Sequence, residues 1–168
     1  MITVLRADIT TLPVDAIVNA ANAALRGGGG VDGAIHRAAG PQLMRELQQY
    51  GSCATGGAVL TGGYNLPARY VIHAVGPIWH GGSEDEAALL GRTYESAFAR
   101  ALEHHDIHRI AFSAISTGVY GFPKAQAAEI AVGVMRRHET RFDEIIACVF
   151  DSDTQAHYDR ALRRAASA

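Results

Sequence analysis

Four consecutive glycines stand directly in front of a predicted helix near the N-terminus. The run spans residues 27–30 and leads into Val31–Ala39, where Val31, Ile35 and Ala38 share one helical face. Glycine loses more conformational freedom on folding than any other residue, so such a run indicates backbone that no side chain can obstruct. The first N–H groups of a helix have no partner within it and lie at the positive end of its dipole. The segment therefore predicts a site for an anion, with a phosphate group as the obvious candidate.

A second loop has the same character. It follows the predicted strand Ile110–Ile115 and leads to Pro123, a residue that is favoured in the first turn of a helix. The loop consists of Ser116, Thr117, Gly118, Val119, Tyr120, Gly121 and Phe122. Its glycines allow close backbone approach, and its first two residues supply hydroxyl groups. Two such loops at one edge of a sheet could hold a diphosphate from both sides, and a structural turn is the alternative for this loop.

The glycine run has two other interpretations. Gly28, Gly30 and Gly33 match the GxGxxG pattern of dinucleotide-binding folds. That pattern requires a strand that feeds directly into the glycines, whereas the segment from Asn19 to Arg26 intervenes here. The phosphate-binding pattern GxxxxGK[ST] does not occur in the sequence. A plain flexible loop is the remaining alternative.

The composition is that of one globular domain. The chain has 168 residues, of which 48% are hydrophobic and 19% are charged, and we expect a single domain over residues 1–168. The formal net charge of −2 argues against a general nucleic-acid binder, because basic side chains supply most of the affinity for phosphate backbones. One small anion held by backbone N–H groups needs no basic excess.

The cysteines and the hydropathy pattern predict a reducing, aqueous compartment. Cys53 and Cys148 lie far apart and form no CxxC pair. The N-terminal segment MITVLRADIT shows no apolar signal sequence, and no apolar run approaches the roughly 20 residues needed to cross a bilayer. We therefore expect a cytoplasmic protein with no membrane partner and with two thiols that fill core positions.

Short β-branched runs alternate with helical patterns along the chain. The predicted strands are Ile2–Leu5, Ala16–Val18, Ala58–Thr61, Tyr70–Val75, Ile110–Ile115 and Ile145–Phe150. Helical spacing occurs at 31–39, at 41–50, behind Ser83, behind Pro123 and from Asp153 onward. This alternation predicts a three-layer α/β/α sandwich, in which ligands bind beyond the carboxyl ends of the strands.

Ser83 and Glu86 form the pattern of a capping box, with Ser83 as N-cap and Glu86 at the third helical position. Behind this box, Leu90, Tyr94 and Phe98 recur at helical spacing. We therefore expect a helix to begin directly after Ser83.

Five segments together resemble the macrodomain family. They are Ala7–Thr10, Ile17–Asn22, Gly27–Gly40, Tyr70–Pro77 and Ile115–Phe122. The similarity covers nearly the whole chain and is greatest to the MacroD-type branch, which includes bacterial O-acetyl-ADP-ribose deacetylases. The sequence departs from the family at Ala7, where many members have glycine, and at Phe122, where tyrosine is frequent. The resemblance implies an α/β/α sandwich around a mixed sheet of about six strands, with a pocket for ADP-ribose.

The resemblance also assigns residues to the adenine end of that ligand. Asp8 would accept a hydrogen bond from the adenine amino group, the Ile9 amide would support the ring, and Phe150 would stack on it. Without the resemblance, Asp8 would be interpreted as a turn residue and Phe150 as ordinary core.

The diphosphate and the distal ribose would lie between the two glycine-containing loops. The implied contacts are Gly28, Gly29, Gly30, Val31 and Asp32 in the first loop, and Ser116, Thr117, Gly118, Val119, Tyr120, Gly121 and Phe122 in the second. Asn22 would hydrogen-bond the distal ribose, and Asp32 would be the catalytic carboxylate. His36 shares a helix face with Asp32 and would orient Asp32 or a water, unless it is a structural histidine. Asn19 is interpreted as a structural loop residue.

The resemblance implies two related hydrolyses. One removes the acetyl group of O-acetyl-ADP-ribose, and the other releases ADP-ribose from acylated Asp or Glu side chains of mono-ADP-ribosylated proteins. Asp32 would act as general base, while Asn22 positions the ribose hydroxyl or the water. In a second scheme a ligand phosphate activates the water and Asp32 only orients it.

We expect neither a cofactor nor a metal. His104, His105 and His108 form a cluster, but no cysteine or second carboxylate cluster completes a zinc-binding set. His73, within a strand, is interpreted as a packed histidine. Two alternatives to an enzyme stay open: a reader module that binds ADP-ribose and hydrolyses nothing, and a poly(ADP-ribose) or nucleic-acid binder, which the net charge disfavours. A pure reader has no need of Asp32.

Overall fold

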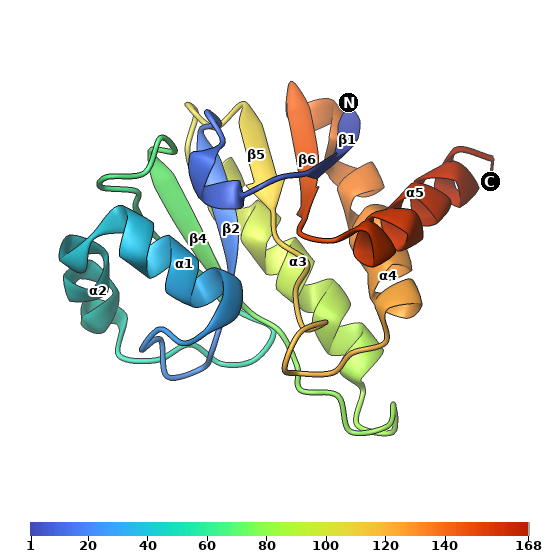
Figure 1. Cartoon of the computed structure of the whole chain (residues 1–168), viewed down its shortest axis with the longest axis horizontal. Coiled ribbons are helices and arrows are strands. Elements are labelled where there is room, and N and C mark those ends of the chain that lie inside the picture. The colour runs from blue at the N-terminus through green and yellow to red at the C-terminus, as the bar shows by residue number, and fades with distance from the viewer. Residues whose placement is uncertain (168) are drawn as a thin grey trace.

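A six-stranded sheet runs through the centre of the molecule (Figure 1). The computed structural model describes residues 1–167. The strands are β1 (Ile2–Arg6), β2 (Ala16–Ala21), β3 (Ala58–Gly62), β4 (Tyr70–Val75), β5 (Arg109–Phe112) and β6 (Glu144–Val149). Their spatial order is β1-β6-β5-β2-β4-β3, with β3 antiparallel to β4 and every other neighbouring pair parallel. The prediction of a mixed sheet of six strands in an α/β/α sandwich is confirmed.

Helices cover both faces of the sheet, and Figure 1 shows α1 in front of it and α3 behind it. One layer contains α1 (Gly30–Ala39), α2 (Pro41–Leu47) and the 3-10 helix η1 (Ile9–Thr11). The other contains α3 (Glu86–Leu102), α4 (Lys124–His138) and α5 (Ser152–Ser167). The 3-10 turns η2 (Gln48–Tyr50) and η3 (Glu139–Arg141) follow α2 and α4. Within the described residues, no helix has both the length and the apolar character needed to span a membrane.

Alternate residues of the central strands face the two helical layers. On β2, Ile17 belongs to the same buried cluster as Ile35 of α1, whereas its neighbour Val18 belongs to the cluster of Phe98 of α3. The same alternation recurs on β4, β5 and β6. Both faces of these strands are buried, which explains why their sequences are nearly continuous apolar runs.

The carboxyl ends of two central strands differ from their predicted bounds. β2 continues to Ala21 because it pairs with β4 along its whole length, so Asn19 lies in a strand and not, as predicted, in a loop. β5 ends at Phe112, earlier than predicted: the Ser113 N–H still donates to the Val18 carbonyl oxygen of β2 at 3.2 Å, but the backbone after it finds partners outside the sheet. One of these is the hydroxyl of Tyr94 on α3, which accepts a hydrogen bond from the Ile115 N–H at 3.2 Å. The two corrections place polar side chains and a loop at the same edge of the sheet.

The predicted capping box at Ser83 is wrong. The N-cap of α3 is Asp85, in the left-handed region at φ 60°, and Glu86 is the first helical residue. The buried Glu86 carboxylate accepts hydrogen bonds from the backbone N–H groups of residues 80, 82 and 84, at 2.7, 3.0 and 2.7 Å. Burial alone would raise the pKa of Glu86, but these donors outweigh it and hold the pKa at about 2. Glu86 therefore shapes the turn before α3 and does not pair with Ser83.

We predict that Glu86→Gln lowers the melting temperature at neutral pH, because a neutral amide is a weaker acceptor for three backbone donors. The folded-state pKa of Glu86 lies below its ordinary value of 4.5, so its stabilisation is present above pH 4.5 and is lost as the pH falls toward about 2. Thermal melts followed by circular dichroism should show the two proteins converging over that range. Glu84→Gln, on an exposed side chain in the same turn, is the control. A gap that stays constant with pH would contradict this role for Glu86.

Candidate functional site

A cavity of about 390 Å³ opens at the carboxyl ends of β2, β4 and β5. Its wall is formed by Ala20, Ala21, Asn22, Gly28, Gly29, Gly30, Val31, Asp32, Gly76, Ala114, Ile115, Ser116, Gly118, Val119 and Tyr120. The two loops singled out in the sequence therefore meet across one cavity. This edge is where ligands of open α/β sheets bind.

The glycine run brings bare backbone to the cavity wall. Gly29 is the N-cap of α1 and no side chain caps this helix, so its first N–H groups keep their hydrogen-bonding capacity. Gly33, one turn into α1, packs against the run itself, since a Cβ there would lie 2.5 Å from the carbonyl oxygen of Gly28. A residue larger than glycine at position 33 would push the loop away from the helix. The local geometry is that of an anion site at a helix N-terminus.

The second loop is anchored to the core at its beginning and at its end. The Ile115 N–H donates to Tyr94, whose hydroxyl lies 3.4 Å from that of Tyr158 on α5. At the other end, Phe122 is 1% exposed and packs against Trp79, with ring centroids 4.8 Å apart. Phe122 was predicted to contact a ligand, but its side chain belongs to the core.

Ser116 holds the strained position of this loop. Its φ of 69° lies in the left-handed region, its side chain is 5% exposed, and its carbonyl oxygen accepts a hydrogen bond from the Phe122 N–H at 2.9 Å. Strained residues of this kind concentrate at binding sites. Gly76 makes room for it, since a Cβ at position 76 would lie 2.2 Å from Ser116 Oγ. Thr117 and Gly121, which were also predicted as contacts, lie on the loop outside the cavity wall.

The Asp32 carboxylate is buried in the cavity wall at the first turn of α1, with 6% exposure. Its Oδ1 accepts a hydrogen bond from Asn19 Nδ2 at 2.8 Å. His36 Nε2 lies 3.3 Å from the same oxygen without hydrogen-bond geometry. The other oxygen, Oδ2, lies on the side of Gly28, 3.5 Å from where a Cβ on that residue would be. The helix N-terminus and Asn19 together compensate a buried charge that would otherwise be unfavourable.

Asn19 connects Asp32 to a buried histidine. Asn19 and His73 are paired across β2 and β4, and Asn19 Nδ2 lies 3.2 Å from His73 Nδ1. His73 Nε2 in turn lies 3.0 Å from Thr61 Oγ1 on β3. Burial, reinforced by nearby His36, lowers the pKa of His73 to about 3, against the opposing effect of Asp32. His73 is thus a packed histidine, as the sequence predicted, and its lowered pKa keeps it neutral.

Asn22 lies on the cavity wall, where a ribose contact was predicted, but its amide also braces the loop. Its Nδ2 donates to the carbonyl oxygen of Gly27 at 2.8 Å, and its Oδ1 accepts from the Arg26 N–H at 3.3 Å. The second N–H of the amide stays available for a ligand. His36 stands behind Asp32, outside the cavity wall.

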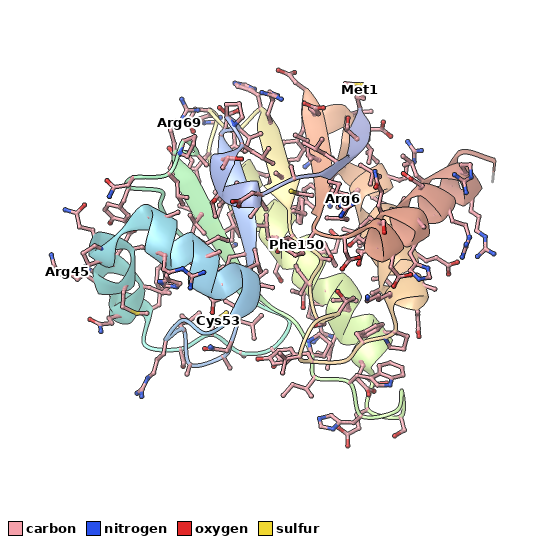
Figure 2. All side chains as sticks on the ribbon, viewed as in Figure 1. Met1, Arg6, Arg45, Cys53, Arg69 and Phe150 are labelled. Carbon is pink, nitrogen blue, oxygen red and sulfur yellow. The ribbon has the colours of Figure 1, made fainter. Side chains whose placement is uncertain are left out.

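The residues predicted to bind adenine follow β1 and β6, on the far side of β5 from the cavity. Phe150 is 87% exposed, which excludes its interpretation as core, and its carbonyl oxygen accepts from Arg6 Nε at 3.4 Å. Figure 2 shows both side chains near the first turn of α5. Asp8 caps η1, where its Oδ1 accepts from the N–H and the hydroxyl of Thr10 at 3.0 and 2.7 Å. The Ile9 side chain is buried, so only its backbone can support a ring.

The other titratable clusters offer no comparable site. Within the described residues, no group of three or more His, Cys, Asp or Glu side chains is arranged to hold a metal ion. His104 packs on Tyr70, with ring centroids 4.8 Å apart. Cys53 and Cys148 are free, and burial raises the pKa of Cys148 to about 11, so that side chain is a thiol.

Several residues of the site were not assigned from the sequence, among them Ala20, Ala21, Ala114 and Ile115 of the cavity wall. Gly76 and Asn19 are the two whose contacts matter most. Gly76 follows β4 directly, so the rule that ligands lie beyond strand ends would have identified it. Asn19 gave no such signal, because its partner His73 is 54 residues away and the pairing of the strands was unknown.

Comparison with known proteins agrees with this geometry. The Macro domain family model matches residues 18–131. An O-acetyl-ADP-ribose deacetylase of Salmonella gallinarum is 52% identical over 166 residues, which cover 95% of this chain and 92% of the relative. An Oceanobacillus iheyensis macrodomain with ADP has a TM-score of 0.91 at 36% identity and covers 98% of this chain and 90% of its own. A Trypanosoma brucei macrodomain in complex with ADP-ribose has a TM-score of 0.87 at 42% identity, over 96% of this chain and 68% of its own.

The chain belongs to the Macro domain family, and the resemblance seen in the sequence is confirmed.

We predict that Gly33→Ala weakens the binding of ADP-ribose by about tenfold or more, because it displaces the glycine loop. A tenfold loss of affinity corresponds to about 1.4 kcal/mol of binding free energy. The added Cβ would lie 2.5 Å from the Gly28 carbonyl oxygen, so the loop must move. Isothermal titration measures the affinity. Gly133→Ala is the matched control, because it is also a helical glycine and a Cβ there meets nothing within 4 Å. Equal affinities of both variants would show that the loop does not need its close contact with α1.

Proposed function

We propose that the protein binds ADP-ribose and hydrolyses the acetyl ester of O-acetyl-ADP-ribose. The observation that carries this proposal is the Asp32 carboxylate, which is buried in the cavity wall and held by Asn19. The substrate class is supported by the Salmonella relative, which is named a deacetylase of this compound, and by the Trypanosoma macrodomain, which holds ADP-ribose.

The proposed ligand would lie along the carboxyl edge of the sheet. The uncapped N-terminus of α1 favours the diphosphate, because it offers N–H donors at the positive end of a helix dipole. Exposed Phe150 offers a face on which adenine can stack, on the β6 side. The distal ribose would then lie in the cavity and point to Asp32 on its wall. A volume of about 390 Å³ is within the range of small-molecule sites, roughly 300–1,000 Å³.

The reaction needs one water and one group that accepts its proton. The water oxygen forms a bond to the ester carbonyl carbon, and the proton it loses passes to Asp32. The bond between that carbon and the ribose oxygen then breaks, and the ribose oxygen takes up the proton from Asp32 and leaves as a hydroxyl, which returns Asp32 to its carboxylate form. Acetate and ADP-ribose are the products. A positioned general base contributes about 10²–10⁴-fold to such a step.

The proposal extends to the proton acceptor, to metal independence and to a second substrate. A phosphate of the ligand is an alternative proton acceptor, in which case Asp32 only orients the water. We also propose that no metal takes part, since Asp32 and its neighbours supply the proton acceptor and the positioning that ester hydrolysis requires. Release of ADP-ribose from modified Asp or Glu side chains of proteins is proposed as a second reaction of the same site, because it also hydrolyses an acyl ester of the distal ribose.

A reader module without activity is the alternative function. A carboxylate near a diphosphate repels the ligand, so a protein selected only for binding would gain affinity from a neutral residue at position 32. The presence of buried Asp32 on the wall therefore favours the enzyme.

We predict that Asp32→Ala lowers turnover of O-acetyl-ADP-ribose by about 10²-fold or more if Asp32 is the general base. Its affinity for ADP-ribose should equal or exceed that of the wild type, because a like charge is removed. Asp32→Asn separates the two schemes, since an orienting residue would tolerate the amide and a base would not. Asn22→Ala should lose both turnover and some affinity.

Steady-state kinetics with and without a chelator, titration with ADP-ribose and circular dichroism measure these effects. A folded Asp32→Ala variant that turns over at the wild-type rate would overturn the proposed mechanism, and loss of wild-type activity on chelation would overturn its metal independence.

Phe150→Ala is expected to weaken ADP-ribose binding, because stacking of a base on an aromatic side chain contributes about 1–3 kcal/mol, or roughly 5- to 150-fold in affinity. The fold should not change, since the side chain is 87% exposed. Titrations with ADP-ribose and with ribose 5-phosphate, which has no adenine, form the test. Only the first ligand should respond to the substitution, and Phe150→Trp should keep the affinity. Asp8→Ala should likewise affect binding more than turnover at saturation.

A further inference from the structure

Four polar side chains form a continuous chain beneath α1 and α2. Thr61 of β3, His73 of β4 and Asn19 of β2 each have 0% exposure, and Asp32 of α1 has 6%. The successive contacts are 3.0 Å from Thr61 Oγ1 to His73 Nε2, 3.2 Å from His73 Nδ1 to Asn19 Nδ2, and 2.8 Å from Asn19 Nδ2 to Asp32 Oδ1. The chain thus runs from the antiparallel edge strand to the carboxylate on the cavity wall.

We propose that His73 is a positioning residue for Asp32, and that it acts as a neutral imidazole with its proton on Nε2. The proposal goes beyond the catalytic role of Asp32 and rests on it. Thr61 and Asn19 are the two other members through which His73 acts.

The hydrogen-bond donors along the chain are consistent with only this tautomer of His73. A carboxylate only accepts hydrogen bonds, so the Asn19 atom beside Asp32 Oδ1 is the amide nitrogen, and its second N–H is directed at His73 Nδ1. Nδ1 must then carry a lone pair, which leaves the proton of a neutral imidazole on Nε2. That N–H donates to Thr61 Oγ1, whose own hydrogen is donated to the Gly62 carbonyl oxygen at 3.1 Å. Every donor in the chain has an acceptor.

The other neutral tautomer of His73, with the proton on Nδ1, is unfavourable for the Asp32 carboxylate. If Nδ1 of His73 carried a proton, the Asn19 amide would have to turn and present its oxygen to His73 and to Asp32. Two acceptor oxygens would then face each other at a separation of about 2.8 Å, where the structure has a hydrogen bond. Burial, reinforced by His36 and opposed by Asp32, lowers the pKa of His73 to about 3, so the doubly protonated form that would have the same effect is absent near neutral pH.

The hydrogen bond from Asn19 determines which carboxylate oxygen of Asp32 is left to face the substrate water. Asn19 occupies Oδ1, and Oδ2 lies on the side of the glycine run, which lines the cavity. A carboxylate released from Asn19 could rotate about its side-chain bonds and present its oxygens differently to the water. The chain therefore acts on the catalytic step and leaves the ligand contacts of the two loops unchanged.

Two pairs of variants test the proposal. His73→Leu and His73→Asn introduce side chains with the same branched heavy-atom skeleton, but only the asparagine can offer an acceptor where Nδ1 lies. Thr61→Val and Thr61→Ser differ in whether the hydroxyl is kept. We expect His73→Leu to lower kcat about tenfold or more, the effect of losing roughly one buried hydrogen bond to the machinery, with KM and ADP-ribose affinity unchanged. His73→Asn and Thr61→Ser should retain most of kcat, and Thr61→Val should lose several-fold.

A second measurement does not depend on activity. Two-bond ¹H–¹⁵N correlation spectra of the wild type report the tautomer of His73 directly, and His73→Asn identifies its signals. We expect protonated Nε2 and unprotonated Nδ1 from about pH 5 to about pH 8. If the wild type does not hydrolyse O-acetyl-ADP-ribose, the proposed function fails, and the spectra still test the tautomer.

A proton on Nδ1 would overturn the proposal, as would equal kcat for His73→Leu and His73→Asn. A variant series that changes only melting temperature would also overturn it, because that result is the mark of a structural cluster. Should His73→Leu fail to fold, the Thr61 pair and the spectra carry the test.

Discussion

The site depends on keeping one negative charge away from water. Asp32 is 6% exposed and carries a carboxylate that an apolar interior would not tolerate. Its compensation comes from two directions: the N-terminus of α1, in whose first turn it lies, and the amide of Asn19, which donates to Oδ1. Both requirements constrain the fold, because α1 must begin beside the end of β2 and β2 must extend far enough to carry Asn19. The glycine run provides the tight connection that lets the helix begin there.

The same geometry explains how a chain with a formal net charge of −2 can present an anion site. Backbone N–H groups at an uncapped helix start are partial positive charges whose positions are set by the fold. Among the residues that the structure describes, no arginine or lysine lines the cavity. Recognition by backbone would select for the shape of an anionic group held at a fixed distance.

The sequence predicted the strands of this fold better than it predicted the contacts between them. Short β-branched runs identified every strand. For inner strands such as β6, burial on both faces also imposes a nearly continuous apolar pattern, whereas the edge strands β1 and β3 are only partly buried. The order of the strands in the sheet could not be predicted from these runs, since β1 pairs with β6 from the other end of the chain. Asn19 was misplaced for this reason: it is paired with His73 on the adjacent strand, and its side chain lies against that histidine. Glu86 was misplaced because a Ser-x-x-Glu spacing does not distinguish a carboxylate that caps a helix from one that organises the turn before it. Phe150 was assigned to the adenine end only through the family resemblance, since its one-residue distance from a buried strand does not reveal which way the ring points.

The hydrogen bond between the Ile115 N–H and the buried Tyr94 hydroxyl ties the cavity loop to the interior of the domain. Tyr94 has 0% exposure and meets Tyr158, 2% exposed, from the C-terminal helix, so this anchor can open only when helices α3 and α5 part from the core. A few residues further on, Val119 is fully exposed at the tip of the same loop. Amide hydrogen exchange should therefore differ within this short segment. The Ile115 amide should exchange only through global unfolding, whereas the amides at the tip should exchange through local fluctuations. The tip of the loop can therefore adapt to a ligand while the base of the loop stays fixed to the core.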